Sequence, residues 1–246
     1  MNFCVVIPVY REELLSHEKI SLRRINEVFR GIPKFLYFPE NINVKSYTGQ
    51  IDGVHLRHFD QAYFSSIDSY NLLLKSAAFY TPVIDFDYML VYQLDSYIFQ
   101  EEKIYDCLKW GYDYVGAPWL SPDWFDRSEK TIAKFKFLRP WINRVGNGGF
   151  SLRKVKTFHS FCLRFPFVGK LVNIQEDIFW SNVVPRLTTG FKLASIERAL
   201  EFSFDEHPQE CFSLNKQRLP FGCHGWQKND YGFWKTYIKD VDEVTP

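Results

Sequence analysis

The sequence has almost no net charge and few cysteines, and both shortages exclude classes of protein. Its 246 residues include 30 basic and 29 acidic side chains, so the formal net charge is +1. A field this weak does not attract nucleic acid or an acidic membrane to the whole molecule, so any electrostatic function must be local. The five cysteines are scattered and form no C-x-x-C pair. This argues against a zinc knuckle or a disulfide framework and favours a reducing cytoplasm.

Long hydrophobic runs and familiar catalytic signatures are missing as well. No apolar run approaches the ~20 residues needed to cross a bilayer, and residues 1–8 read as a strand rather than a signal peptide. We therefore expect a soluble, cytoplasmic protein that is at most peripheral at the inner membrane face. The motifs G-x-x-x-x-G-K-[ST], G-x-G-x-x-G, G-x-S-x-G and H-E-x-x-H are absent. Their absence argues against P-loop, dinucleotide-binding, acyl-transfer and zinc-protease chemistry.

Aromatic residues are abundant, at 18% of a composition that is 46% hydrophobic and 24% charged. A domain of this size removes roughly 70–75% of its unfolded surface from water, so we expect a single domain over residues 1–246. Most aromatic side chains should fill its core. Exposed Trp and Tyr residues near a site could instead stack on the apolar faces of sugar rings.

Hydrophobic patterning predicts an α/β fold that opens with a βαβ unit. A strand at 3–7, a helix reaching about residue 28 and a strand at 33–39 form this unit. The right-handed crossover places the strand ends, and with them a ligand crevice, at one edge of the sheet. Further strands are expected at 54–59, 88–95 and 112–119, and helices at 66–80, 101–109, 154–163 and from 176.

The strand at 88–95 ends on Gln93-Leu94-Asp95, which places a carboxylate at the carboxyl edge of the sheet. A carboxylate there could help to bind the cation that accompanies a nucleotide diphosphate, because such a cation prefers oxygen ligands. Equally, Asp95 could cap the helix that follows. His224 lies among glycines, where the backbone can approach a ligand closely. Its imidazole could join an oxygen-rich shell that favours Mn²⁺ over Mg²⁺, or could form a structural hydrogen bond.

Two further segments carry candidate site residues. Asn147-Gly148-Gly149 could bind sugar hydroxyls through its amides and the Asn side chain, or could form a hairpin or bulge turn. Glu176 and Asp177 open a helix, where acids are favoured by the helix dipole, and one of them could accept a proton from an attacking hydroxyl.

Taken in order, these elements resemble the GT-A fold nucleotide-sugar glycosyltransferases, and longer blocks are similar to a bacterial glycosyltransferase-like family. The blocks are residues 110–119, 146–153, 176–180 and 219–226. The resemblance implies a Rossmann-like, mostly parallel mixed sheet flanked by helices. It also implies a nucleotide-binding half at about 1–110 and an acceptor-binding half at about 111–230.

The resemblance also implies roles for these residues. Asp95 and His224 would bind the cation, Mn²⁺ or Mg²⁺, although the usual Asp-x-Asp motif is here Gln93-Leu94-Asp95. Asp177 would be the catalytic base of an inverting enzyme, with Glu176 helping to bind the acceptor. The remaining residues would bind the donor: Pro8, Val9 and Tyr10 at the nucleotide base, Gln93 at the ribose or a metal-bound water, and Asn147, Gly148 and Gly149 at the sugar.

The expected function is transfer of a sugar, of the hexosyl type, from a nucleotide diphosphate to an acceptor hydroxyl in surface polysaccharide or glycan synthesis. A non-catalytic carbohydrate-binding protein and a sugar nucleotidyltransferase are the alternatives. Residues 120–142 are expected to form a mobile surface excursion. The basic and aromatic stretch at 133–144 could contact a lipid-linked acceptor or form a solvated loop.

Overall fold

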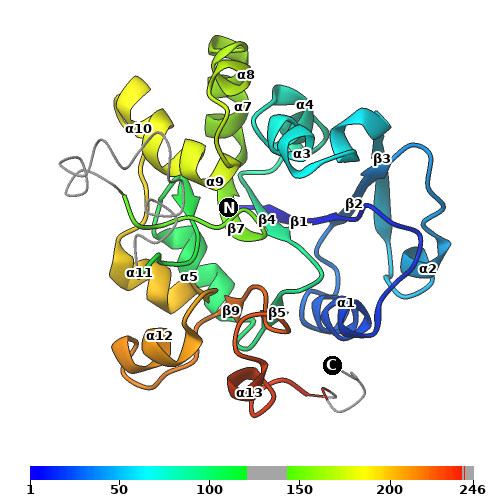
Figure 1. Ribbon diagram of the computed structural model, residues 1–246, viewed down its shortest axis with the longest axis vertical. Coiled ribbons are helices and arrows are strands. Elements are labelled where there is room, and N and C mark those ends of the chain that lie inside the picture. Colours follow the sequence, from blue (N-terminus) through cyan, green and yellow to red (C-terminus); the bar gives the residue numbers. More distant parts are fainter. Residues whose placement is uncertain (121–142, 240, 242–246) are drawn as a thin grey trace.

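The computed structural model describes residues 1–120, 143–239 and 241 (Figure 1). The expected excursion at 120–142 therefore lies outside the described residues except for Leu120, and so does most of the basic and aromatic stretch at 133–144.

A six-stranded sheet in the order β3-β2-β1-β4-β7-β6 forms the centre of the molecule. The first four strands in chain order run parallel, whereas β7 is antiparallel to both β4 and β6. This mixed, mainly parallel sheet confirms the expected α/β class. The strands are β1 (Phe3–Pro8), β2 (Lys34–Pro39), β3 (Val54–Phe59), β4 (Tyr88–Tyr92), β6 (Tyr114–Val115) and β7 (Phe150–Lys154).

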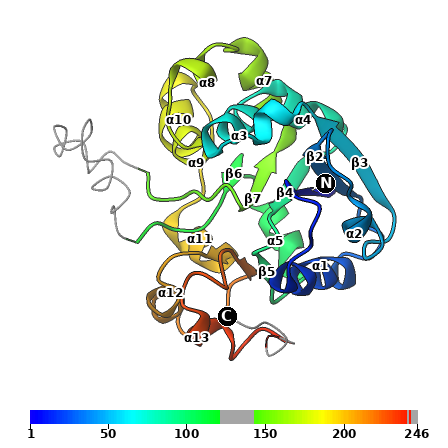
Figure 2. The same ribbon diagram turned by 45° about the vertical axis from the view of Figure 1, so that its right-hand side comes forward.

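Helices cover both faces of the sheet (Figure 2). Side chains that alternate along β1 enter different cores: Val5 and Ile7 pack toward α1 and α5, and Cys4 and Val6 toward α3, α4 and α7. Strands such as β1 and β4 face a hydrophobic core on each side of the sheet. Their residues are therefore apolar throughout and do not alternate between apolar and polar. The helices are α1 (Ser16–Val28), α2 (Lys45–Thr48), α3 (Ile67–Leu74), α4 (Ala77–Tyr80), α5 (Lys103–Lys109), α7 (Val155–Arg164), α8 (Val168–Leu171), α9 (Glu176–Ile178), α10 (Val184–Leu187), α11 (Ile196–Phe202), α12 (Pro208–Leu214) and α13 (Tyr231–Trp234), with single turns at Gln61–Phe64, Thr81–Val83 and Phe179–Val183.

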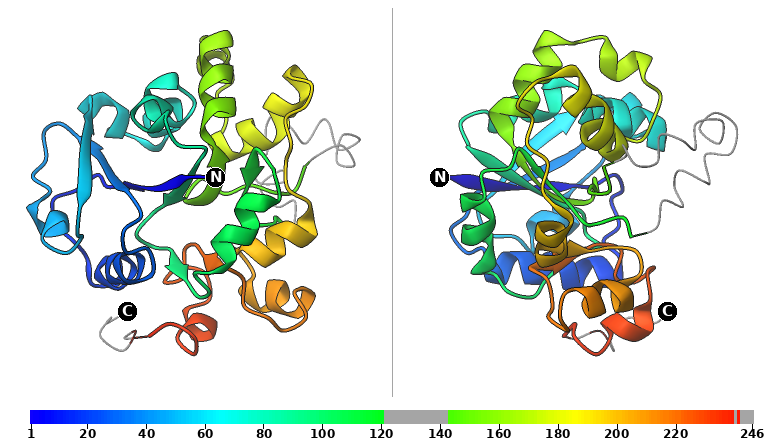
Figure 3. Two further views of the ribbon diagram at one scale, coloured as in Figure 1. Left: turned by 180° about the vertical axis from the view of Figure 1, so that it is seen from behind. Right: turned by 90° about the vertical axis from the view of Figure 1, so that its left-hand side faces the viewer.

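A second, small sheet joins the C-terminal part of the chain to the end of β4 (Figure 3). Its strands β5 (Tyr97–Ile98), β8 (Ser203–Phe204) and β9 (Gly222–Cys223) lie in the order β5-β9-β8. A third hydrophobic cluster, which includes Trp226 and Trp234, fixes it against α12 and α13. Segments that lie more than one hundred residues apart in the sequence, β5 and the pair β8 and β9, therefore meet just after β4.

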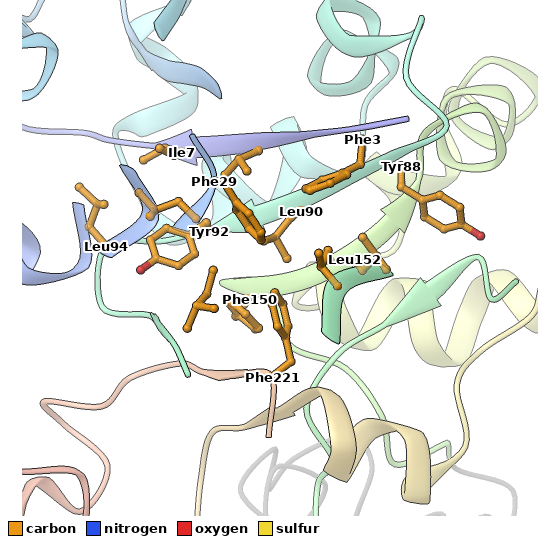
Figure 4. Packing of buried hydrophobic residues seen from close by; sticks show 14 of the residues in the cluster. Phe3, Ile7, Phe29, Tyr88, Leu90, Tyr92, Leu94, Phe150, Leu152 and Phe221 are labelled. Carbon is orange, nitrogen blue, oxygen red and sulfur yellow. The ribbon is translucent and has the colours of Figure 1, made fainter. Parts of the chain in front are cut away.

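The aromatic residues largely fill the core, as expected. Phe3, Phe29, Phe150 and Phe221 pack between the sheet and the helices beneath it (Figure 4). All five cysteines are also buried and unpaired. Burial raises the pKa of the Cys162 thiol to about 12. Within the described part of the chain, no helix is long and apolar enough to cross a bilayer.

Three local expectations were wrong. The helix expected at 66–80 is interrupted between α3 and α4, where the ammonium of Lys75 turns inward and donates to the carbonyls of Val172 and Ile174. The strand expected at 88–95 ends at Tyr92, because the chain turns at 93–96, where the Ser96 amide donates to the Gln93 carbonyl. Residues 112–119 contribute only β6 to the sheet.

Two alternatives for site residues also fail. Asp95 does not cap a helix, since the next element is β5. Asn147 does not form a tight hairpin turn, because the strands on either side, β6 and β7, are joined by a long connection. The expected helix start at Glu176 is confirmed by α9.

Candidate active site at the carboxyl edge of the sheet

The backbone brings Asp95 and His224 together from distant parts of the chain. Gln93 pairs with the residue before β7 by donating its amide to the carbonyl of Gly149, and the turn that follows carries Asp95 away from the sheet. The pairing of β5 with β9 then places the loop after β9 beside this turn, and the amide of Trp226 donates to the carbonyl of Asp95. Both side chains are therefore fixed by strand ends rather than by long loops.

The imidazole of His224 lies between polar groups on both sides. Its Nε2 is 3.1 Å from Oδ1 of Asp95 and 3.1 Å from Oε1 of Gln93. Its Nδ1 is 3.2 Å from Oδ1 of Asp205, which follows β8. Because β8 runs parallel to β9, the two strands deliver Asp205 and His224 to the same end of the small sheet.

These contacts determine the charges of the cluster. Burial alone would lower the pKa of His224, but Asp95 and Asp205 raise it to about 10. Burial alone would raise the pKa of Asp95, but His224 and Lys228 hold it well below its ordinary value. The ammonium of Lys228 lies 3.0 Å from Oδ2 of Asp95. The protein therefore presents an ionised carboxylate flanked by two cations.

Asn147, Gly148 and Gly149 form one wall of this cluster. Nδ2 of Asn147 donates to Asp205 over 2.6 Å, and its Oδ1 accepts from the amide of Gly149. A Cβ atom on Gly149 would lie 2.0 Å from Nε2 of His224 and 2.6 Å from Oε1 of Gln93. Gly149 is thus required for the close approach of these groups, because any side chain would displace them.

Glu176 is held by a buried ion pair on the other side of this wall. Its two carboxylate oxygens accept from the guanidinium of Arg153 over 3.0 and 3.1 Å, and only 3% of Glu176 is exposed. Arg153 also donates to the hydroxyl of Tyr80 and to the carbonyl of Gly148. This arrangement favours a supporting role for Glu176 over direct contact with an acceptor.

Asp177 lies next to this pair and is half-buried. Burial raises the pKa of its carboxyl to about 7, and the negative charges of Glu176 and Asp205 add to that effect, while Arg153 opposes it. A carboxyl group with this pKa can take up or release a proton near neutral pH, as a general base must.

The residues expected at the nucleotide base lie at the end of β1. Val9 is buried and donates its amide to Tyr37, whereas Tyr10 is exposed beneath the guanidinium of Arg11. His17, at the start of α1, lies edge-on to Trp226 with ring centroids 6.3 Å apart, and the amide of Trp226 donates to the carbonyl of Asp95. The start of α1 therefore lies near the Asp95 cluster.

Sequence reasoning missed Asp205, Lys228 and Arg153. Asp205 directly follows the apolar end of β8. Because β8 has only two residues, it gives no periodic signal in the sequence. Lys228 lies four residues after His224, and nothing in that spacing indicates a contact with Asp95. Arg153 lies within β7, where a charged residue is normally on an exposed face.

The ligand atoms of this cluster fit a divalent cation whose coordination shell is completed by another molecule. In residues 1–120 and 143–239, no three or more His, Cys, Asp or Glu side chains converge as a complete metal site. Asp95 and Nε2 of His224 provide two ligand atoms on one side, with the amide oxygen of Gln93 beside them. The contact from Asp205 to Nδ1 is the hydrogen bond that commonly orients a metal-binding histidine.

Solved structures with a similar fold are glycosyltransferases of the GT-A type. Mouse xyloside xylosyltransferase 1 in its apo form is similar with a TM-score of 0.55 and 11% identity, covering 100% of both chains. The galactosyltransferase LgtC in complex with donor and acceptor sugar analogs has a TM-score of 0.53 and 10% identity, covering 89% of this chain and 86% of that chain. The bifunctional glycosyltransferase WbbM has a TM-score of 0.52 and 12% identity, covering 97% of this chain and 50% of that chain. At these identities the likeness establishes the fold.

The chain belongs to the family described as a protein of unknown function, DUF5672, whose profile matches residues 53–224. The match includes Gln93, Asp95, Asn147, Asp177 and His224. A search of the curated proteins finds no match to the sequence.

Proposed function

We propose that the protein is a glycosyltransferase that moves a sugar from a nucleotide diphosphate donor to an acceptor hydroxyl, with Mn²⁺ or Mg²⁺ bound. The observation that carries the proposal is the contact between Asp95 and His224 at the carboxyl edge of a GT-A sheet. Ligands of open α/β sheets bind at this edge. Two neighbours in fold are named as a xylosyltransferase and a galactosyltransferase, which supports the same class of reaction.

Asp95 and His224 would hold the cation, and Asp205 orients the imidazole so that Nε2 faces the site. When bound, the cation neutralises negative charge that grows on the leaving diphosphate. Lys228 adds a positive charge at the same place, since its ammonium already contacts Asp95. The loop at Pro8, Val9 and Tyr10 would receive the nucleotide base.

Asp177 accepts the proton of the attacking hydroxyl in this proposal, which predicts inversion at the anomeric carbon. With a pKa of about 7, the carboxyl group is partly ionised at neutral pH. Its carboxylate is also basic enough to accept a proton readily. Arg153 and Glu176 fix the adjacent backbone, because Arg153 bridges the Glu176 carboxylate and the Gly148 carbonyl. Asn147, Gly148 and Gly149 would line the pocket for the donor sugar, and Glu176 acts as a positioning residue.

The experiment is a screen of nucleotide sugars with Mn²⁺, followed by donor hydrolysis and transfer assays with and without EDTA. Stabilisation against heat by one nucleotide diphosphate sugar, and loss of turnover with EDTA, are expected. A carbohydrate-binding protein would be stabilised by free glycans and would not hydrolyse donors. A nucleotidyltransferase would release pyrophosphate from a nucleoside triphosphate. The natural setting we propose is cytoplasmic glycan or surface polysaccharide synthesis.

A further inference from the structure

The corner formed by the end of α7 and by α8 presents large apolar side chains to solvent. Leu163, Phe167 and Leu171 are 62%, 70% and 80% exposed. The opposite side of α7 packs in the core through Phe158 and Phe161. Figures 1 and 2 place this α7–α8 corner at one end of the molecule, far from α12 and α13.

The corner is anchored, so its exposed residues do not result from a loose chain. Gly169 of α8 packs so closely on Lys75 that an added Cβ would lie 3.0 Å from the Cβ of that lysine. The ammonium of Lys75 donates to the carbonyls of Val172 and Ile174, just after α8. The apolar side chains are therefore held outward by a fixed backbone.

Basic residues accompany these apolar groups along the chain, and Asp113 contacts α7 at its first turn, through the hydroxyl of Thr157. Between Val155 and Gln175 the sequence contains Lys156, Arg164 and Lys170 but no Asp or Glu. All three basic residues are exposed. The whole chain has a net charge of only +1, so this corner concentrates positive charge that the rest of the molecule balances.

We infer that the α7–α8 corner docks on a bilayer containing anionic phospholipids. Apolar side chains that enter the headgroup region, flanked by lysine and arginine that face anionic lipid, are the two contributions that bind a protein to such a surface. A second copy of this chain fits less well, because a stable protein interface needs about 800 Å² on each partner, whereas this surface is a protruding corner. Like charges would also oppose each other across it. The inference goes beyond the proposed function and does not depend on it.

The test is flotation of the full chain with vesicles of phosphatidylcholine and phosphatidylglycerol, compared with vesicles of phosphatidylcholine alone. We expect binding to the anionic vesicles only, weakened by salt. The double variant Phe167→Ser/Leu171→Ser should bind at least about tenfold more weakly, since each large apolar side chain withdrawn from lipid removes that order of affinity. Arg164→Gln/Lys170→Gln should lose about tenfold.

Matched controls are Leu214→Ser, which changes an exposed leucine of α12 at the other end of the molecule, and Lys109→Gln, which removes an exposed charge from α5. Both should bind vesicles like the unchanged protein. Thermal unfolding of every variant confirms that it is folded. Failure of the unchanged protein to float, or equal binding by the corner variants, would overturn the inference. A dimer in solution that Phe167→Ser dissociates would assign the corner to a second copy and would overturn it too.

Discussion

Nε2 of His224 lies 3.1 Å from Oδ1 of Asp95, and this contact joins the turn after β4 to the loop after β9. In the protein without a cation, the imidazole is protonated at neutral pH, because its neighbouring carboxylates raise its pKa to about 10. A cation that binds both residues must displace that proton. The pair therefore couples cation binding to proton release.

Asp95→Ala should abolish Mn²⁺-dependent donor binding while leaving the fold intact. The carboxylate is the anionic ligand of the proposed site, and its removal leaves the cations of His224 and Lys228 without their shared partner. Calorimetric titration with Mn²⁺ and donor measures the effect. Asp106→Ala, at an exposed carboxylate of α5, is the control. Normal affinity of Asp95→Ala would contradict the assignment of the cation site.

Asp205→Asn should lower both the pKa of His224 and the affinity for Mn²⁺. The variant removes one of the two negative charges that raise this pKa to about 10. Loss of such an orienting partner typically costs about 10–100-fold in metal affinity. NMR titration of the imidazole and calorimetry report the two effects separately. Glu206→Gln, at the exposed neighbouring residue, should change neither. An unchanged His224 titration would remove Asp205 from this role.

Gly149→Ala should reduce turnover at least about 100-fold, because a displacement of about 1 Å in a catalytic group can cost that much. The new methyl carbon would lie 2.0 Å from Nε2 of His224, which must move. Steady-state transfer rates test this. Gly49→Ala is the matched control, since its Cβ meets only the carbonyl of Lys45, at 3.4 Å. Equal turnover of the two variants would show that the close approach at Gly149 is dispensable.

Asp177→Asn should keep donor binding while turnover falls by about 10²–10⁴-fold, which is the usual contribution of a general base. In the unchanged enzyme, kcat/KM should rise as the pH passes through about 7, because only the ionised carboxylate accepts a proton. A rate profile that is flat through this range, together with near-normal turnover of the variant, would exclude Asp177 as the base.

The same substitution has a stability effect that does not depend on activity. The folded protein keeps the proton of Asp177 up to about pH 7, whereas the unfolded chain loses it at the ordinary, lower pKa. Ionisation of this carboxyl thus destabilises the folded protein progressively as the pH rises. Asp177→Asn should therefore raise the free energy of unfolding by about 1–2 kcal/mol at about pH 8 and by little at about pH 4. Urea unfolding at both pH values measures the difference, and equal changes would contradict the raised pKa.

Arg153→Met should destabilise the protein by about 3–5 kcal/mol, because it leaves the carboxylate of Glu176 buried without a partner. Adding Glu176→Leu should restore part of this loss. Urea unfolding of the single and double variants gives the coupling between the two residues. An additive double variant would show that the buried pair is not a unit.

Much of the fold could be predicted because its strands are continuous apolar runs. β1 and β4 face helices on both sides, so their sequences show a signal strong enough to locate them within a few residues. Asp95 could be selected because it follows such a run, and His224 because it lies among glycines. Their chemical roles stay predictions.

The remaining features arise from contacts that no local pattern contains. The break between α3 and α4 depends on Lys75 reaching carbonyls almost one hundred residues later in the chain. Asp205 and Lys228 acquire their significance only when the small sheet brings three short strands together. Glu176 was expected to help bind an acceptor. Its carboxylate instead pairs with Arg153, and this contact forms only because β7 and α9 lie side by side.

The five enclosed thiols give this protein a practical property. Their raised pKa and lack of access make each of them a poor target for maleimides and iodoacetamide while the chain is folded. A single cysteine introduced at position 167 could therefore carry a fluorophore or spin label without removal of the natural ones. Such a reporter would follow the depth of that position in a lipid interface directly.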